Sequence, residues 1–513
     1  MHKAIIPLLY VLIFSVSNLF AGNGSKPHYN DKDINHIVSQ LTLEQKARLL
    51  VGCPGSDKGV SHIVAGSAGY TFPIDSLDIP SINLADGPVG VRITPVLPNK
   101  PYTSYCTCFP STTALAATWN KDIARLEGNA IGDEALAYGV DIVLTPGINI
   151  MRNPLCGRNF EYFSEDPYLS GIMGAAMING IQDKGIGASL KHFIANNQQT
   201  GKLYNDARIS QRAIREIYLK GFEICIKNSD PWTVMGSYNK IGGQYTQANP
   251  ELLRTILRNE WNYNGLIVTD WYKKRDTADQ LNGGTDLMMP GEQSQVDEII
   301  AGVKNGRISE TTLNKSVKYV LKLISKSISN KGWEYNEAPD LAANAALARR
   351  IATEGMVLLK NDRSFLPISQ GAKIALFGAT AYKSIAGGTG SSNVNKAHIT
   401  DISTGLEKGG YTLSNRLKGL YTKFVEFQND LLDKHPESTD WEKLSYNRTV
   451  IAEMDLSKAE SIIGQEAKNS DIALIVIGRG SGEESDRRLE GDFYLTPEEK
   501  FMIENVSSQF HAA

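Results

Sequence analysis

Short apolar runs alternate with longer amphipathic stretches between residues 40 and 320. Because buried parallel strands appear as short apolar runs and surface helices as amphipathic stretches, this alternation predicts a parallel sheet, either a barrel or a doubly wound sheet. A segment of about 300 residues suits a (β/α)8 barrel with insertions. The predicted strands are residues 82–84, 140–144, 187–190, 233–237, 266–269 and 286–289, and helical patterns between them include residues 124–134, 210–227 and 250–260.

A second segment of the same α/β kind follows a polar stretch with Gly and Pro at residues 328–340. Residues 341–353 are Ala-rich and predict a helix, and strands are predicted at 356–359, 374–377 and 472–477. Thr496, Pro497 and Glu499 have the pattern of a capped helix start. A helix in a parallel sheet normally leads to another strand, whereas the sequence stops at Ala513, so we expect a truncated C-terminus with an open sheet edge.

The first residues differ from the rest of the chain. Lys3 precedes a run from residue 4 to residue 16 without any charge, and Ala21 ends the segment. A short basic start, a short apolar run and a small final residue predict a signal peptide over residues 1–21, and hence export to the periplasm or the extracellular space. A membrane anchor is the alternative, although the apolar run is short for a membrane span.

Composition narrows the classes of function. The chain is 42% hydrophobic and 21% charged, so it can bury a large core, and its net charge of −3 gives no single-sign field for holding nucleic acid. Its 5 cysteines are too sparse for a disulfide framework. Walker A, GxGxxG, HExxH and GxSxG motifs are absent from the sequence, which removes the usual support for nucleotide, zinc-protease and serine-hydrolase functions.

Polar residues follow the predicted strands of the first segment one after another. In a barrel the carboxyl ends of the strands share one rim, where active sites lie. An Asp after a strand is usually a turn former or helix cap, but a series of five strand ends with charged or aromatic groups is harder to explain in that way. The residues at these ends are Asp86, Arg158 with Glu161 and Asp166, Lys191 with His192, Tyr238, and Asp270 with Trp271.

This mixture of groups suits a neutral polyol. Carboxylates and charged donors bind hydroxyl groups, and Trp271 offers a ring on which a sugar face can stack. An Asp near Lys191, His192 and Arg158 is expected to stay ionised, because opposite charge favours the carboxylate. An ionised, positioned carboxylate can attack an anomeric carbon, and a second carboxyl group must then protonate the leaving oxygen.

Nearly the whole chain after residue 40 resembles glycoside hydrolase family 3, the β-glucosidase type. The stretches that carry the resemblance are LADGPVGVR (84–92), CFPSTTALAATWN (108–120), GRNFEYFSEDP (157–167), KHFIANNQ (191–198), MGSYNKIGG (235–243), VTDW (268–271), EGMVLLKND (354–362), GGTGSS (387–392) and GRGSGEESDRR (478–488). The resemblance implies an α/β protein with a (β/α)8-like barrel over residues 22–335, a linker and helix over 336–353, and a truncated α/β sandwich domain over 354–513. The site would lie in the cleft between the two domains.

The resemblance also implies roles for individual residues. Asp270 in VTDW takes the place of the family's catalytic nucleophile, and Glu483 takes that of the acid/base, with Glu484 as second choice. From the charge run alone, which also holds Asp486, Glu483 would be interpreted as a solvated surface residue. The terminal-sugar subsite would be formed by Asp86, Arg158, Lys191, His192, Tyr238 and Trp271.

The expected reaction is retaining hydrolysis of a terminal β-glucoside by double displacement, with a small carbohydrate as the partner and neither a metal nor an organic cofactor. Lys202 departs from the family, because members with the KHFIANN motif often carry an arginine there, and an ammonium group cannot replace a bidentate guanidinium. The alternatives are a β-xylosidase or another exo-glycosidase of the family, and a truncated, inactive carbohydrate-binding relative.

Overall fold

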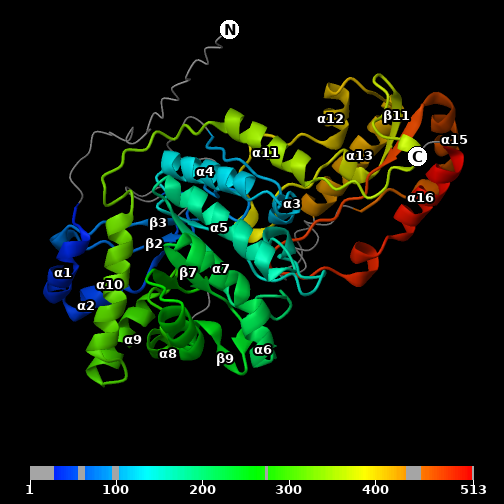
Figure 1. Ribbon diagram of the computed structural model, residues 1–513. Helices are drawn as coiled ribbons and strands as arrows, with labels where there is room; N and C mark the ends of the chain where they lie inside the picture. Colours follow the sequence, from blue (N-terminus) through cyan, green and yellow to red (C-terminus); the bar gives the residue numbers. More distant parts are fainter. Residues whose placement is uncertain (1–27, 56–63, 95–102, 272–274, 435–451, 511–513) are drawn as a thin grey trace, which may run out of the picture.

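The computed structural model describes residues 28–55, 64–94, 103–271, 275–434 and 452–510. The predicted signal peptide, residues 1–21, lies outside the described residues. The described chain forms two α/β units, a larger one with a curled sheet and a smaller one that holds the end of the chain (Figure 1). All the cysteines are free thiols, in agreement with the expectation that no disulfide framework exists.

The sheet of the first unit has seven strands in the order β1-β2-β3-β4-β5-β7-β10, antiparallel from β1 to β3 and parallel from β3 to β10. Leu287 pairs with Val268 in β10, and Met288 pairs with Val51 just before β1, so this segment brings the two edges of the sheet together. The sheet is therefore a barrel-like variant of the predicted (β/α)8 fold. The strands are β1 (Cys53–Pro54), β2 (Gly69–Tyr70), β3 (Asn83–Asp86), β4 (Ile142–Leu144), β5 (Gly187–Phe193), β7 (Thr233–Gly236) and β10 (Leu266–Val268).

Residues 286–289 were predicted as a strand, and the structure gives them only the isolated pairings of Leu287 and Met288. The other strands predicted for this unit are present with ends shifted by a few residues. A small separate sheet of β6 (Asp206–Ala207), β8 (Lys240–Ile241) and β9 (Gln244–Tyr245) lies beyond the ends of β5 and β7.

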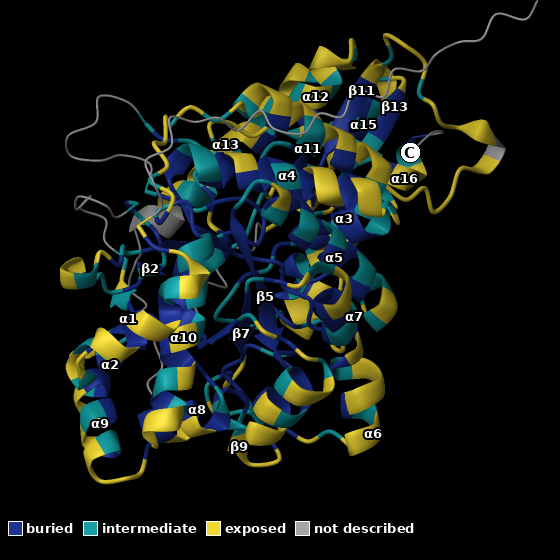
Figure 2. Ribbon diagram, turned by 60° about the vertical axis from the view of Figure 1, so that its left-hand side comes forward, coloured by how far each residue is buried: buried dark blue, intermediate teal, exposed yellow. Residues whose placement is uncertain are grey.

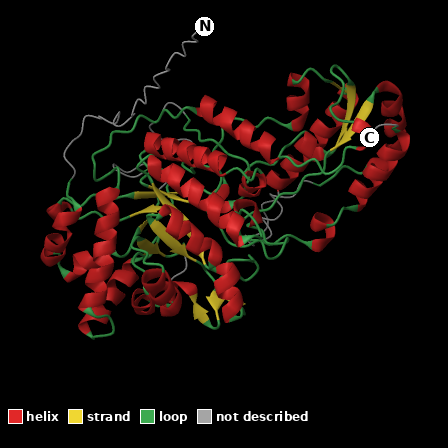
Figure 3. Ribbon diagram, in the orientation of Figure 1, coloured by secondary structure: helices red, strands yellow, loops and turns green. Residues whose placement is uncertain are grey.

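Helices surround the curled sheet, and their outer faces are exposed whereas the strands are buried (Figures 2 and 3). They include the predicted helical segments, although residues 251–260 form a π-type helix. The helices are α1 (Ile34–Gln40), α2 (Leu43–Leu49), α3 (Thr112–Ala117), α4 (Lys121–Tyr138), α5 (Pro167–Asp183), α6 (Gln211–Ala213), η4 (Ile214–Tyr218), α7 (Lys220–Ser229), η6 (Glu251–Glu260), α8 (Thr277–Gly283), α9 (Gln293–Lys304) and α10 (Glu310–Lys326).

Both faces of the strands are buried, which explains why the strands appear in the sequence as continuous apolar runs. Leu84 and Ile142 belong to a hydrophobic cluster with α1, α2, α9 and α10. Ala85 and Val143, one residue further along the same strands, belong to a different cluster with α3, α4, α5 and α7. Successive side chains of a strand point to opposite faces, so both faces need apolar residues.

The second unit contains a parallel three-stranded sheet in the order β12-β11-β13. Phe377 in the central strand packs edge to face against Phe510, at the end of α16. The Thr496 and Glu499 side chains form the predicted capping box at the start of α16. The helix α11 (Leu341–Gly355) precedes this unit and packs on the first unit against α3 and α4, where Ile351 joins the hydrophobic cluster. The elements of the second unit are β11 (Lys373–Phe377), α12 (Ile402–Lys408), β12 (Thr412–Leu413), α13 (Asn415–Lys434), α15 (Glu460–Asn469), β13 (Ile472–Ile475) and α16 (Pro497–Gln509).

The prediction of a strand at residues 356–359 was wrong. These residues form no secondary structure, and the apolar side chain of Leu359 is 91% exposed. A run such as Met-Val-Leu-Leu forms a strand only where a neighbouring strand satisfies its backbone groups, and within the described residues it has no strand partner.

Candidate active site

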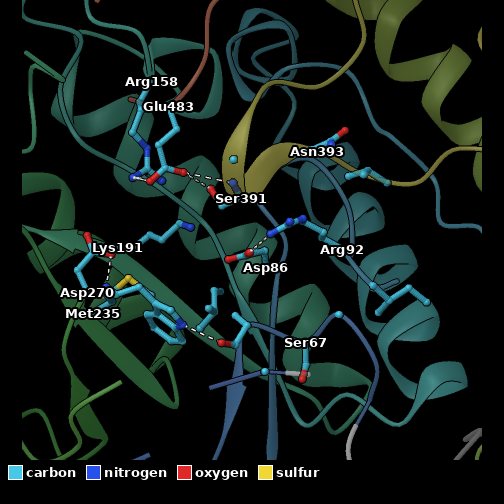
Figure 4. Close-up of a pocket in the computed structure, with 18 of the residues that line it drawn as sticks. Ser67, Asp86, Arg92, Arg158, Lys191, Met235, Asp270, Ser391, Asn393 and Glu483 are labelled. Carbon is cyan, nitrogen blue, oxygen red and sulfur yellow. Dashed lines mark hydrogen bonds and ion pairs between the residues drawn. The ribbon is translucent and has the colours of Figure 1, made fainter. Parts of the chain in front are cut away.

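The strand ends of the first unit place the predicted polar residues around one cavity of about 1050 Å³ (Figure 4). Asp86 is the last residue of β3, Lys191 and His192 lie within β5, and Asp270 follows β10 by two residues. Lys191, His192 and Asp270 are buried, and the Asp86 side chain is 14% exposed. The predicted site residues that line the cavity are Asp86, Arg158, Lys191, His192, Tyr238, Asp270, Trp271 and Glu483.

Glu483 reaches this cavity from the second unit. Its Oε1 lies 3.2 Å from Arg158 Nη1 and 3.4 Å from Lys202 Nζ. Its Oε2 accepts hydrogen bonds from the Ser391 hydroxyl at 2.9 Å and from the Ser391 amide at 3.2 Å. The first unit thus contributes the carboxyl groups of Asp86 and Asp270 to the cavity, and the second contributes those of Glu483 and Glu484. Figure 4 shows Asp86, Asp270 and Glu483 around it.

The charges around Glu483 favour its ionised form. Burial acts to raise the pKa of this carboxyl group, but Arg158, Lys202 and Lys191 outweigh burial and hold the pKa well below its usual range. In the cavity as the structure shows it, Glu483 is thus an ion-paired carboxylate. An acid that protonates a leaving oxygen must gain its proton before that step.

Asp270 is in the opposite situation. Burial raises its pKa to about 6, and the nearby Arg158 only partly opposes this effect. Its Oδ1 accepts a hydrogen bond from the Trp271 amide at 2.8 Å, and its Oδ2 lies 3.9 Å from His192 Nε2. The cations around Asp270 do favour its ionised form, but desolvation of the buried carboxylate has the larger effect on its pKa. Asp270 is still mainly ionised at neutral pH.

His192 is held in its neutral form. Burial lowers its pKa well below the usual value, and the positive charges of Arg158, Lys191 and Lys202 lower it further. Its Nδ1 lies 3.2 Å from the Tyr162 hydroxyl and 3.3 Å from Asn149 Oδ1, which orients the ring toward Asp270. A neutral imidazole can exchange hydrogen bonds with a sugar hydroxyl without adding a charge to the cavity.

Arg158 is fixed by its own neighbourhood. Its Nε donates to Glu161, a buried carboxylate three residues later in η3 (Asn159–Glu161). The neighbouring carboxylates Glu161 and Glu483 outweigh burial and raise the pKa of Arg158. Glu161 therefore holds the guanidinium while its other nitrogen reaches Glu483.

Comparison with known families gives two matches that together cover most of the chain. The profile described as "Glycosyl hydrolase family 3 N terminal domain" matches residues 101–323, and that described as "Glycosyl hydrolase family 3 C-terminal domain" matches residues 356–512. The chain belongs to glycoside hydrolase family 3.

Similar family 3 proteins include enzymes that act on different sugars. Thermostable beta-glucosidase B of Acetivibrio thermocellus is 40% identical over 410 residues, covering 78% of this chain and 51% of that protein. An exo-alpha-(1->6)-L-arabinopyranosidase of Bifidobacterium longum is 37% identical over 467 residues, covering 88% of this chain and 55% of the relative. The chain spans about half the length of the curated relatives it matches.

A solved structure of family 3 has the same fold. Beta-glucosidase 3B from Thermotoga neapolitana, in complex with α-D-glucose, superimposes with a TM-score of 0.86 at 41% sequence identity. The match covers 93% of this chain and 67% of that structure.

The sequence analysis missed several residues that line the cavity, among them Arg92 and Ser391. Arg92 Nη1 lies 3.1 Å from Asp86 Oδ2, and Ser391 holds Glu483. Arg92 stands in the same quoted stretch as Asp86, and Ser391 stands in GGTGSS, so both motifs contained the signal. Burial raises the pKa of Asp86, although Lys191 and Arg92 act against it.

Lys202, the departure from the family pattern, also lies at the cavity edge. Its Nζ is 2.6 Å from Glu484 Oε1 and 4.9 Å from the centre of the Tyr238 ring. The Glu484 side chain is 41% exposed, against 12% for Glu483. Lys202 thus bridges both candidate acids, and Glu483 is the one turned toward the interior.

The described residues contain no helix both long and apolar enough to cross a membrane, and no cluster of three or more His, Cys, Asp or Glu side chains suited to a metal ion.

Proposed function

We propose that this protein is a retaining, exo-acting β-glucosidase that releases terminal sugars from β-glucosides and oligosaccharides. The observation that carries the proposal is the presence of Asp270 and Glu483 in one cavity, each supplied by a different unit. The beta-glucosidase relatives and the glucose complex of the Thermotoga neapolitana enzyme support it.

In the first step Asp270 attacks the anomeric carbon while Glu483 protonates the leaving oxygen, which gives a glycosyl-enzyme. Glu483 is ionised in the empty cavity because Arg158 and Lys202 pair with it. Sugar hydroxyls that bind Arg158 and Lys191 compete with this pairing, and Glu483 takes up its proton as the substrate enters. The remaining negative charge on Asp270 favours this uptake, because like charges cannot both stay ionised at low cost.

The second step reverses the role of Glu483. Once Asp270 is esterified it carries no charge, so the pKa of Glu483 falls again and the residue returns to the ionised form. In that form it removes a proton from water, which attacks the glycosyl-enzyme and releases the sugar with retained configuration. These roles run against the pKa shifts of the structure without substrate, in which the pKa of Glu483 is lowered and that of Asp270 is raised. The mechanism therefore depends on the proton that Glu483 gains when the sugar displaces its cationic partners.

The other cavity residues hold the sugar. Asp86, Arg158, Lys191 and His192 present acceptors and donors to its hydroxyl groups, while Tyr238 and Trp271 form aromatic walls. The Trp271 ring is fixed by a hydrogen bond from Nε1 to the Ala68 carbonyl at 2.9 Å.

The apolar start of the sequence supports export, and N-terminal sequencing of protein recovered outside the cytoplasm tests for removal of residues 1–21.

A panel of aryl glycosides tests the function. The purified chain is assayed on aryl β-glucoside, β-xyloside and α-L-arabinopyranoside, the last because of the Bifidobacterium longum relative. We expect kcat/KM to be highest on the β-glucoside. Preference for the xyloside or the arabinopyranoside would assign a different exo-glycosidase, and glucose binding by calorimetry without any turnover would indicate a carbohydrate-binding protein.

A further inference from the structure

The loop that carries Glu483 contains a second carboxylate with an unusual set of partners. Asp486 Oδ1 accepts hydrogen bonds from the amides of Gly157 at 3.1 Å and Gln199 at 2.8 Å. Its Oδ2 accepts one from the amide of Thr200 at 2.9 Å. All these amides belong to the first unit, in the segments that follow β4 and β5, whereas Asp486 belongs to the second.

Further contacts join the same loop to the same two segments. The Arg487 amide donates to the Leu155 carbonyl at 2.7 Å, and the Glu484 amide donates to Gln199 Oε1 at 3.4 Å. Gly482 pairs with Ser485 as an antiparallel bridge, so Glu483 lies at the tip of a tight turn. The turn is thus docked on the first unit by the residues that follow Glu483 in the chain.

The geometry points to Asp486 as a positioning residue: we propose that its carboxylate fixes the Glu483 turn to the first unit and so sets the distance between the proton donor and the sugar held there. This inference rests on the proposed glycosidase function. Charge-assisted hydrogen bonds from backbone amides are short and directional, so they suit this task. Side chains alone would leave a turn from a separate unit free to shift, and a shift of about 1 Å in a catalytic group can cost on the order of 100-fold in rate.

Leaving-group dependence is the readout that a merely structural role would not change. A dinitrophenyl leaving group departs without a proton, whereas an alkyl alcohol needs one. In Asp486→Asn we expect kcat/KM to fall roughly 100-fold on an alkyl β-glucoside and by less than about 5-fold on dinitrophenyl β-glucoside. Asp486→Glu keeps the charge on a longer side chain and is expected to lie between Asn and the unchanged protein.

A matched control is Asp401→Asn in the second unit. Asp401 Oδ1 accepts the Ser384 amide at 2.6 Å, so this variant also removes a carboxylate bound to a backbone amide, but away from the cavity. We expect the ratio of the two substrates to stay as in the unchanged protein. If Asp486→Asn does not fold, Asp486→Glu carries the same comparison.

The outcomes separate the proposed glycosidase function from the proposed positioning role of Asp486. An unchanged protein that hydrolyses neither substrate would reject the proposed function itself. An active unchanged protein whose Asp486→Asn and Asp486→Glu variants lose both substrates equally, or neither, would overturn the positioning role.

Discussion

Arg158 of the first unit pairs with Glu483 of the second, with 3.2 Å between Nη1 and Oε1. This contact makes the protonation of the proposed acid depend on a residue that also lines the sugar cavity. Any ligand that engages Arg158 therefore changes the charge balance at Glu483. Binding and proton transfer are coupled through one buried guanidinium, which Glu161 holds in place.

Removal of Glu483 should slow hydrolysis in a way that depends on the leaving group. For Glu483→Ala we expect kcat to fall by about 10² to 10⁴ on substrates that need a proton. Added azide should restore turnover of a dinitrophenyl β-glucoside, because the small anion enters the space and replaces activated water. Glu484→Ala is the matched neighbour and should stay within a few-fold of the unchanged protein. Azide rescue of Glu484→Ala and not of Glu483→Ala would transfer the role to Glu484.

Asp270 sets the expected pH dependence. Only its carboxylate attacks, and burial raises its pKa to about 6, so kcat/KM on dinitrophenyl β-glucoside, whose leaving group needs no proton, should fall about tenfold per pH unit below pH 6. Lys202 lowers the pKa of Glu483, whereas Arg158 and Lys191 are the main cations that act on the pKa of Asp270. Lys202→Met should therefore leave this acidic limb in place, and on an alkyl β-glucoside, which needs a proton from Glu483, it should raise kcat/KM because the pKa of Glu483 moves up toward its usual range. A pH profile that is flat down to pH 4 would contradict the assignment.

Residues at strand ends could be predicted because the sequence shows both the apolar run that forms each parallel strand and the position at which the run ends. Asp86, Lys191, His192 and Asp270 are examples, and the structure places them on one cavity. Glu483 came only from the family resemblance. Its position depends on how a second unit docks, and a local run of charges carries no information on that contact.

What the sequence did not predict also depends on contacts made only in the folded protein. The apolar run at residues 356–359 lacks a strand partner among the described residues, and sequence periodicity shows a tendency to pair but not the presence of a neighbour. For Asp270 the sequence predicted an ionised carboxylate near cations, but not the direction in which its pKa shifts. How deeply the side chain is buried decides the direction, and burial is known only from the fold.

Asp270→Asn should stabilise the folded protein while hydrolysis falls to background. A rise in pKa from 3.8 to about 6 on folding means that the ionised carboxylate costs up to about 3 kcal/mol of stability above pH 6. This cost vanishes below pH 3.8, where the group is protonated in both states. The melting temperature of the variant should therefore exceed that of the unchanged protein at pH 8, with the gap closing toward pH 4.

Asp286→Asn is the contrasting control for that measurement. Burial raises the pKa of Asp286 as well, but unlike Asp270 its Oδ2 accepts hydrogen bonds from Arg258 at 2.6 Å and from the Ile267 amide at 2.9 Å, and removing its charge leaves the buried guanidinium without this charged partner. We expect this variant to lose stability by about 3 to 5 kcal/mol. A lower melting temperature for Asp270→Asn at pH 8 would show that the Asp270 carboxylate is stabilised by its surroundings.

Gly157→Ala should disturb the Glu483 turn directly. A Cβ on Gly157 would lie 1.8 Å from the Ser485 carbonyl oxygen and 2.4 Å from that of Gly482, so the turn must move away. We expect kcat/KM on an alkyl β-glucoside to fall by on the order of 100-fold, with a smaller loss on a dinitrophenyl β-glucoside. Gly405→Ala in α12 is the control, because its Cβ meets nothing within 4 Å and alanine favours a helix interior. Full activity of Gly157→Ala on the alkyl substrate would mean that the turn tolerates displacement, and that close backbone contact is not what places Glu483.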